Sequence, residues 1–148
     1  MINVFKAAPN TFDSSFTKKD KHMKTLKNVL LVNALSSGAT GLGLIAFAAP
    51  IAILFGISEP TPVVEVGIFL VVFAILVFRE SRRAIYNLRM VKLIIALDIA
   101  WVLVSALIVL LQLFYLTPLA YFAISAVALW VAGMAYLQIN GMKRLTVA

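Results

Sequence analysis

The sequence predicts an all-α protein: an up-and-down bundle of four transmembrane helices with both chain termini in the cytoplasm. Three observations lead to this fold class. Of the 148 residues, 63% are hydrophobic and only 13% are charged, whereas a soluble domain is typically about half apolar and about a quarter charged. The apolar residues form four long segments, and the basic residues lie between or outside them. A chain this short is unable to bury so much apolar surface in water.

The four predicted spans follow from bilayer thickness, because a hydrocarbon core of about 30 Å requires roughly 17–25 apolar residues in a helix. Four segments come close to this length or reach it: about 29–49, 63–78, 93–115 and 119–139. Proline lies where these helices are expected to stop or start. Pro50 follows the first segment, and Pro60 and Pro118 precede the second and the fourth.

The basic residues predict the orientation of the bundle. Six of the 13 Lys and Arg residues precede the first span, five lie between the second and third spans, and two follow the fourth. The other two links contain no basic residue. Because Lys and Arg are retained on the cytoplasmic side, both termini and the middle link are predicted to be cytoplasmic. The predicted location is the cytoplasmic (inner) membrane of a bacterium, as a multi-pass protein.

The N-terminal segment differs in composition from the rest of the chain. Residues 1–24 mix Asn, Thr, Ser and Lys with scattered Phe, and residues 25–148 contain the four spans. We interpret residues 1–24 as a hydrophilic cytoplasmic segment, either disordered or lying on the membrane surface. Met1 and Met23 are both possible starts. A cleaved signal peptide is not expected, because the region before the first apolar run is too long.

The stretch SGATGLG at residues 37–43 first resembles a phosphate-binding turn. Its spacing, G-x-x-G-x-G, departs from the dinucleotide pattern G-x-G-x-x-G, and no alternation of strands and helices follows it. We therefore interpret the small residues as a helix-packing stripe on the first span. Small side chains four residues apart let another helix approach closely. The residues of this stripe are Ala34, Ser37, Gly38, Gly41 and Gly43.

Asp98 is the clearest ionisable residue inside a predicted span, where a charge costs about 2.5–3.5 kcal/mol near the helix centre. Asp98, Ser105 and Gln112 are spaced seven apart and are predicted to share one face of the third helix. Trp101 lies one turn after Asp98.

The topology brings further polar residues to the depth of Asp98. Asn33 of the first span and Gln138 of the fourth are predicted to form an inner polar cluster with Asp98 and one arginine that reaches inward. The candidate arginines are Arg79, Arg82 and Arg83. Three roles stay open for this cluster: a structural knot that fixes helix order, a ligand or proton site, and a protonated Asp98 that is merely tolerated.

The sequence has few residues suited to catalysis, metal binding or nucleotide binding. The chain has no cysteine, its one histidine is His22 in the N-terminal segment, and it contains no P-loop. We therefore predict no catalytic residue, no metal site in the bundle and no cofactor. The net charge of +7 is attributed to topology and attraction to lipid headgroups, not to nucleic acid, because no basic groove is interleaved with aromatic residues.

The segments LVNALSSGATGLGLIAF, PIAILFGI, ALDIAWVLVSALIVL and LTPLAY resemble a group of small four-span bacterial inner-membrane proteins of unknown role. The resemblance covers about residues 26–145 and implies a four-helix membrane fold, but no activity. It includes Asn33, the small-residue stripe, an LFG turn at residues 54–56 and the face that carries Asp98, Trp101 and Ser105.

The leading functional prediction is a non-enzymatic integral membrane protein, either an accessory subunit or a binder of a small lipophilic ligand. Its expected partners are the lipid bilayer and either another membrane protein or further copies of the same chain. The runner-up is a small oligomeric transporter or channel subunit that uses Asp98. A third alternative is an intramembrane lipid-modifying enzyme in which Asp98 acts as acid and base.

Overall fold

The computed structural model is all-α and describes the backbone of residues 11–147 and the side chains of residues 23–144. Its elements are α1 (Thr11–Ala46), α2 (Ala48–Phe55), α3 (Thr61–Ser81), α4 (Leu88–Leu110), the 3-10 turn η1 (Leu113–Tyr115) and α5 (Pro118–Val147). Four helical stretches are long and apolar enough to cross a membrane: Met23–Ala46, Thr61–Ser81, Leu88–Leu110 and Pro118–Arg144. The prediction of an all-α bundle with four helices of membrane-spanning length is confirmed.

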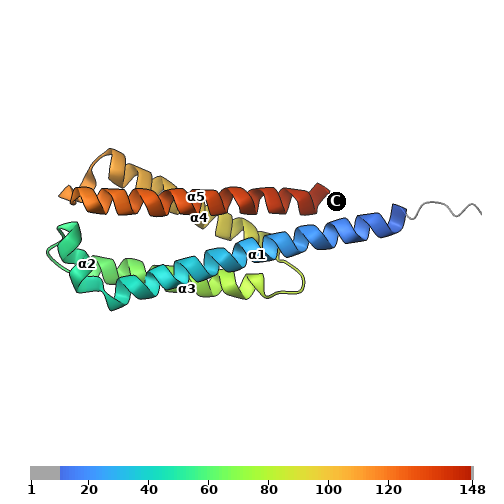
Figure 1. Ribbon diagram of the computed structural model, residues 1–148, viewed down its shortest axis with the longest axis horizontal. Coiled ribbons are helices and arrows are strands. Elements are labelled where there is room, and N and C mark those ends of the chain that lie inside the picture. Colours follow the sequence, from blue (N-terminus) through green and yellow to red (C-terminus); the bar gives the residue numbers. More distant parts are fainter. Residues whose placement is uncertain (1–10, 148) are drawn as a thin grey trace, which may run out of the picture.

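The long helices form two antiparallel hairpins (Figure 1). One hairpin pairs α1 with α3, and the other pairs α4 with α5. The hairpins meet mainly where α1 packs on α5, while α3 and α4 touch at few points. The bundle is therefore well packed on three sides and loosely packed on the fourth.

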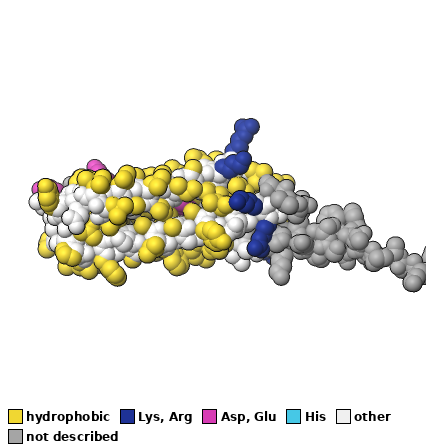
Figure 2. Space-filling model, turned by 90° about the horizontal axis from the view of Figure 1, so that it is seen from above, with side chains coloured by type: hydrophobic (Ala, Val, Ile, Leu, Met, Phe, Trp, Pro, Cys, Tyr) yellow, Lys and Arg dark blue, Asp and Glu magenta, His cyan; other side chains and the backbone are white. Residues whose placement is uncertain are grey.

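The Lys and Arg side chains of the described residues gather at one end of the bundle (Figure 2). The C-terminal end of α5, the N-terminal part of α1 and the link between α3 and α4 all lie at one end (Figure 1). Figure 2 shows Lys and Arg side chains gathered near this end, and acidic side chains at the opposite end and near the middle of the bundle. We call the two ends the basic end and the far end. That the basic end faces the cytoplasm stays a prediction from the charge pattern.

The first span differs from its predicted limits. Helix α1 begins at Thr11, so residues 11–24 continue the span as helix, while residues 1–10 lie outside the described residues. Helix α1 ends at Ala46, and Phe47 interrupts the helical conformation before α2 begins. Pro50 therefore lies in the first turn of α2, where its missing N–H costs nothing. The prediction that Pro50 ends the first span is wrong.

Helix α4 starts earlier and ends earlier than predicted. It starts at Leu88, because the side chain of Asn87 accepts a hydrogen bond of 3.1 Å from the backbone N–H of Arg89 and caps the helix. It ends at Leu110, and the residues that follow include three with positive φ: Gln112, Phe114 and Tyr115. Gln112 is therefore not on the helical face of Asp98, and that part of the prediction is wrong.

The glycines of α1 lie against α3. A Cβ atom on Gly41 would lie 2.7 Å from the carbonyl oxygen of Gly67, and a Cβ on Gly67 would lie 2.8 Å from the carbonyl oxygen of Gly41. Gly38 also faces α3, where its Cβ would meet that of Ala74 at 3.4 Å. The two backbones thus cross in direct contact, as the small-residue stripe predicted.

Gly43 is an exception within the stripe. A Cβ atom there would meet no described atom within 4 Å, so Gly43 takes no part in helix packing. Two residues after Gly41, it lies on the other side of α1. Of the other members of the stripe, Gly38 is partly buried and the rest are buried: Gly41, Ala34 in the apolar core, and Ser37, which is 8% exposed.

The larger of two buried apolar clusters among the described residues, the apolar core, lies toward the basic end and joins α1, α3 and α4. Its buried side chains are Leu26, Leu30, Ala34, Phe73, Val77 and Ile94. This core holds α4 against the first hairpin where the cluster of Asp98 begins.

The far end is closed by a turn that joins the two hairpins. Gly56, with φ of 75°, ends α2 in the left-handed conformation that glycine adopts readily. The backbone N–H of Thr117 donates to the Phe55 carbonyl (3.1 Å), and its hydroxyl donates to the Leu54 carbonyl (2.7 Å). The same hydroxyl oxygen accepts from the N–H of Ala120 (3.3 Å) and so caps α5.

Candidate functional site

Three of the predicted polar residues meet in the interior of the bundle. Asp98 on α4 is 2% exposed, and its Oδ2 accepts a hydrogen bond of 2.9 Å from Nδ2 of Asn33 on α1. The same oxygen accepts a second bond of 2.9 Å from Nε2 of Gln138 on α5. Asn33 and Gln138 are completely buried. The carboxylate thus links three helices that come from both hairpins.

The hydrogen bonding of this cluster is incomplete. The hydroxyl of Ser37 donates to Oδ1 of Asn33 at 3.4 Å. Oδ1 of Asp98 accepts no hydrogen bond from any described residue, and Oε1 of Gln138 is buried without a partner among those residues. One acceptor oxygen of the carboxylate is therefore available to another molecule.

No described arginine approaches Asp98 within ion-pair distance, so this part of the prediction is wrong. Asp98 lies ten residues after Leu88, or about 15 Å along the helix axis at about 1.5 Å per residue. That depth is beyond the reach of side chains at the end of α3. Arg79, Arg82 and Arg83 are exposed, and Arg83 has a nearer partner in Glu80.

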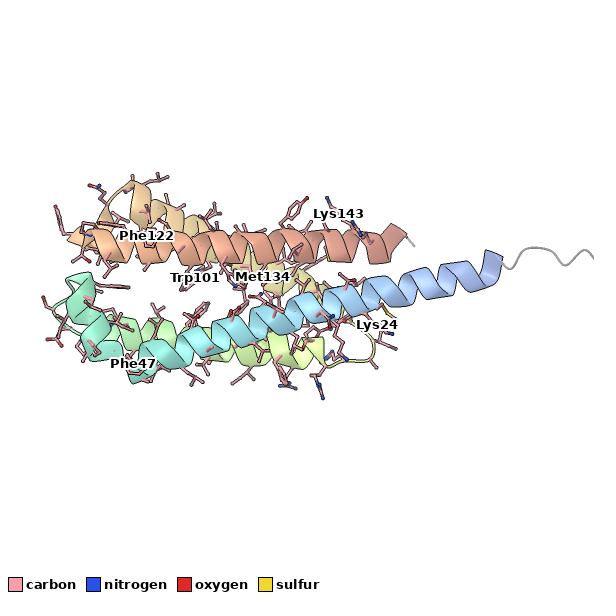
Figure 3. The ribbon with its side chains drawn as sticks, viewed as in Figure 1. Lys24, Phe47, Trp101, Phe122, Met134 and Lys143 are labelled. Atoms are coloured by element: carbon pink, nitrogen blue, oxygen red, sulfur yellow. The ribbon has the colours of Figure 1, made fainter. Side chains whose placement is uncertain are left out.

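A cavity of about 350 Å³ lies beside the cluster, bordered by α1, α3, α4 and α5. Asp98, Ser36, Ser37 and Thr40 provide its polar groups. The remaining lining is aromatic and aliphatic: Phe69, Leu70, Phe73, Leu97, Trp101, Ala126, Val127, Trp130 and Val131. Figure 3 shows Trp101 between the two hairpins. The site is thus an apolar chamber with a carboxylate in its wall.

Aromatic rings form much of this wall. Trp101 stacks on Phe69 with ring centroids 5.9 Å apart and ring planes 6° from parallel, and Phe69 continues the stack to Phe73 at 6.5 Å. The indole N–H of Trp101 is buried and has no partner among the described residues. The indole N–H of Trp130 donates to the hydroxyl of Ser36 at 3.2 Å.

Sequence reasoning identified part of this site. Asn33, Asp98 and Gln138 are brought together, and Trp101 lines the cavity, whereas Ser105 is buried on α4 but does not border it. The site and interior residues that were not predicted include Ser36, Thr40, Phe69, Phe73, Glu80 and Trp130. For three of these residues, the spacing along the sequence could have indicated a position facing the site. Phe69 and Phe73 are four apart on α3, and Trp130 lies eight residues before Gln138 on α5.

Glu80 is a second buried carboxylate, at the basic end, with 2% exposure. Its Oε1 accepts from the backbone N–H of Asn87 (2.7 Å), and its Oε2 lies 3.3 Å from Nε of Arg83. Nearby, the hydroxyl of Tyr86 donates to the Met23 carbonyl at 3.1 Å. Burial raises the pKa of Tyr86, and the negative charge of Glu80 raises it further. Through its contacts with Asn87 and Arg83, Glu80 fixes the link between α3 and α4.

Metal chemistry has no visible support in the described part of the chain. No three His, Cys, Asp or Glu side chains there lie close enough to hold a metal ion. The cavity presents a carboxylate, three hydroxyl groups and aromatic faces, a set of groups that favours an organic ligand.

Comparison with protein families, curated proteins and solved structures gives no match for this chain. No family is therefore identified, and the described helices support only the general part of the resemblance stated above. The chain is a protein with four long apolar helices, consistent with a four-span integral membrane protein.

Proposed function

We propose that this protein binds a small lipophilic ligand inside the membrane, in the cavity beside Asp98. One observation carries the proposal: an apolar chamber of about 350 Å³ in the bundle has a buried carboxylate in its wall. Its size falls in the range of about 300–1,000 Å³ that ligand sites occupy. Such sites combine apolar walls with a few polar groups that orient the ligand.

The lining of the cavity provides both apolar surface and a polar group. Phe69, Trp101 and Trp130 offer broad apolar surfaces, and the free Oδ1 of Asp98 offers a hydrogen-bond acceptor. Binding is proposed in preference to catalysis because Asp98 is the one ionisable side chain on the described lining. Acid–base enzymes commonly set two titratable groups against each other.

The test is native mass spectrometry of protein extracted gently from its own membrane. Ala126 lines the cavity, so Ala126→Phe fills it. Ala100 is exposed on α4 and does not border the cavity, so Ala100→Phe is the matched control. We expect a lipophilic molecule to remain with the wild type and with Ala100→Phe, and to be lost from Ala126→Phe. Equal retention by both variants, or none by the wild type, would contradict the proposal.

Transport is the second candidate, and the loose contact between α3 and α4 favours it. Alternating access requires two halves of a bundle to move against each other, and the two hairpins are joined mainly through α1 and α5. A transporter is expected to produce flux in liposomes that Asp98→Asn abolishes. Binding without flux would leave the protein as a binder alone.

A further inference from the structure

The carboxylate of Asp98 lacks a counter-charge within the described residues. Two amide groups donate to its Oδ2, and no described Lys or Arg lies within ion-pair distance of either oxygen. A buried charge is costly unless a partner of opposite sign compensates it. Neutral amides offset only part of that cost, so the wall of the cavity favours a positive charge beside Oδ1.

The aromatic rings add to this preference. Phe69, Phe73, Trp101 and Trp130 all border the same cavity as Asp98. The face of an aromatic ring carries a negative electrostatic potential, which attracts cations and most strongly so for tryptophan. Carboxylate and ring faces together repel an anion and stabilise a cation with an apolar body.

A bare metal ion does not fit this lining. Ca²⁺ and Mg²⁺ require about six or more oxygen ligands from protein or water, while the cavity offers one carboxylate and three hydroxyl groups among many carbon atoms. Most of the ligands would therefore have to be waters held against an apolar wall. An organic cation needs only one close anion, because its charge is spread over carbon-bearing groups that pack against the apolar walls.

We propose that the ligand is a lipophilic organic cation, a protonated or quaternary amine whose charge lies between the Asp98 carboxylate and the surrounding aromatic rings. This inference rests on the proposed function, since it names the ligand class of that same cavity. It adds a charge requirement that binding of a neutral lipophile does not have.

The experiment compares benzyltrimethylammonium with neopentylbenzene, its neutral isostere in which carbon replaces nitrogen. Both tryptophans of the chain line the cavity, so intrinsic fluorescence reports on occupancy without a label. The full chain is placed in nanodiscs of zwitterionic lipid, and empty nanodiscs correct for partitioning of each probe into the bilayer. We expect the wild type to bind the ammonium at least tenfold more tightly than the isostere.

The matched variants are Asp98→Asn and Glu65→Gln. Each removes one carboxylate charge with little change of shape, but Glu65 is exposed on α3, outside the cavity. Asp98→Asn is expected to bring the preference for the ammonium close to onefold, while Glu65→Gln keeps it. If Asp98→Asn fails to fold, Trp101→Leu replaces it. That variant keeps the carboxylate and is expected to weaken binding of the ammonium more than binding of the isostere.

The outcomes separate the two proposals. Equal binding of the two probes to the wild type would overturn the cation inference and leave lipophilic binding standing. A preference that persists in Asp98→Asn would also overturn it. If neither probe perturbs the tryptophan fluorescence and neither is retained in equilibrium dialysis, both proposals fall.

Discussion

The crossing of Gly41 and Gly67 is the most exacting packing feature of the bundle, and Gly41→Ala tests it. The added Cβ would lie 2.7 Å from the Gly67 carbonyl oxygen, whereas the ordinary contact at Gly38 is 3.4 Å. The difference between these distances means that α1 and α3 must separate here by about 0.7 Å. Overpacking of this kind costs about 1–3 kcal/mol.

Gly43→Ala is the control for the change in helix propensity. Alanine exceeds glycine by about 0.8–1.0 kcal/mol in a helix interior, and both positions lie within α1. At Gly43 the new methyl group meets no described atom within 4 Å. The difference in unfolding free energy between the two variants therefore isolates the crossing, and Gly41→Ala is expected to be less stable by about 1–3 kcal/mol.

The assay is the midpoint of SDS-induced unfolding in one mixed-micelle system, followed by circular dichroism for both variants and the wild type. If Gly41→Ala proved as stable as Gly43→Ala, the direct contact between α1 and α3 would be refuted at this position. A second substitution at Gly67 is expected to add little once the helices have separated, because both sites share one contact.

The remaining predictions concern the buried polar groups. Asp98→Ala leaves two buried amide donors without their acceptor and is expected to lower stability by about 2–4 kcal/mol in the same assay, whereas Glu65→Ala at an exposed site changes it little. Thr117→Val removes the α5 cap and the hydroxyl bond to α2, which is expected to cost about 1–2 kcal/mol; an unchanged unfolding midpoint would contradict that role. Glu80→Gln removes a charge that raises the pKa of Tyr86, so tyrosinate absorbance is expected to show a lower Tyr86 pKa, still above 10.0 because burial remains. Because the folded pKa exceeds the unfolded one, the stability due to Tyr86 is retained below pH 10 and lost as the pH rises through the folded pKa. No change in the titration of Tyr86 would contradict this contribution of Glu80 to the Tyr86 pKa.

The four helices and the central carboxylate cluster were predictable because both follow from patterns along the chain. Long apolar runs fix the helices, and alternating direction brings residues of similar depth together. That is why Asn33 and Gln138 reach Asp98. The depth of Asp98 below the basic end was underestimated, because the Asn87 cap starts α4 five residues before the predicted boundary. The error explains why an arginine partner was wrongly expected.

The cavity was not predictable from the sequence, because it depends on which helices fail to pack. Gly67 and Phe69 look like ordinary members of an apolar run, and nothing in the sequence shows that one meets Gly41 while the other meets Trp101. For Glu80 the sequence offered a local indication of an ion pair, because it is an acidic residue beside three arginines. Its burial depends on the backbone of Asn87, a contact across the link that sequence spacing does not reveal.

The lining residues Phe69 and Trp130 are exposed and lie near the middle of α3 and α5. The chamber therefore opens through the side of the bundle, toward hydrocarbon and not toward water. A ligand would arrive by diffusion within the plane of the membrane. Its occupancy would follow its mole fraction among the lipids, so that a compound scarce in water but strongly partitioned would still saturate the protein. Lipid composition would then regulate the protein as directly as ligand supply.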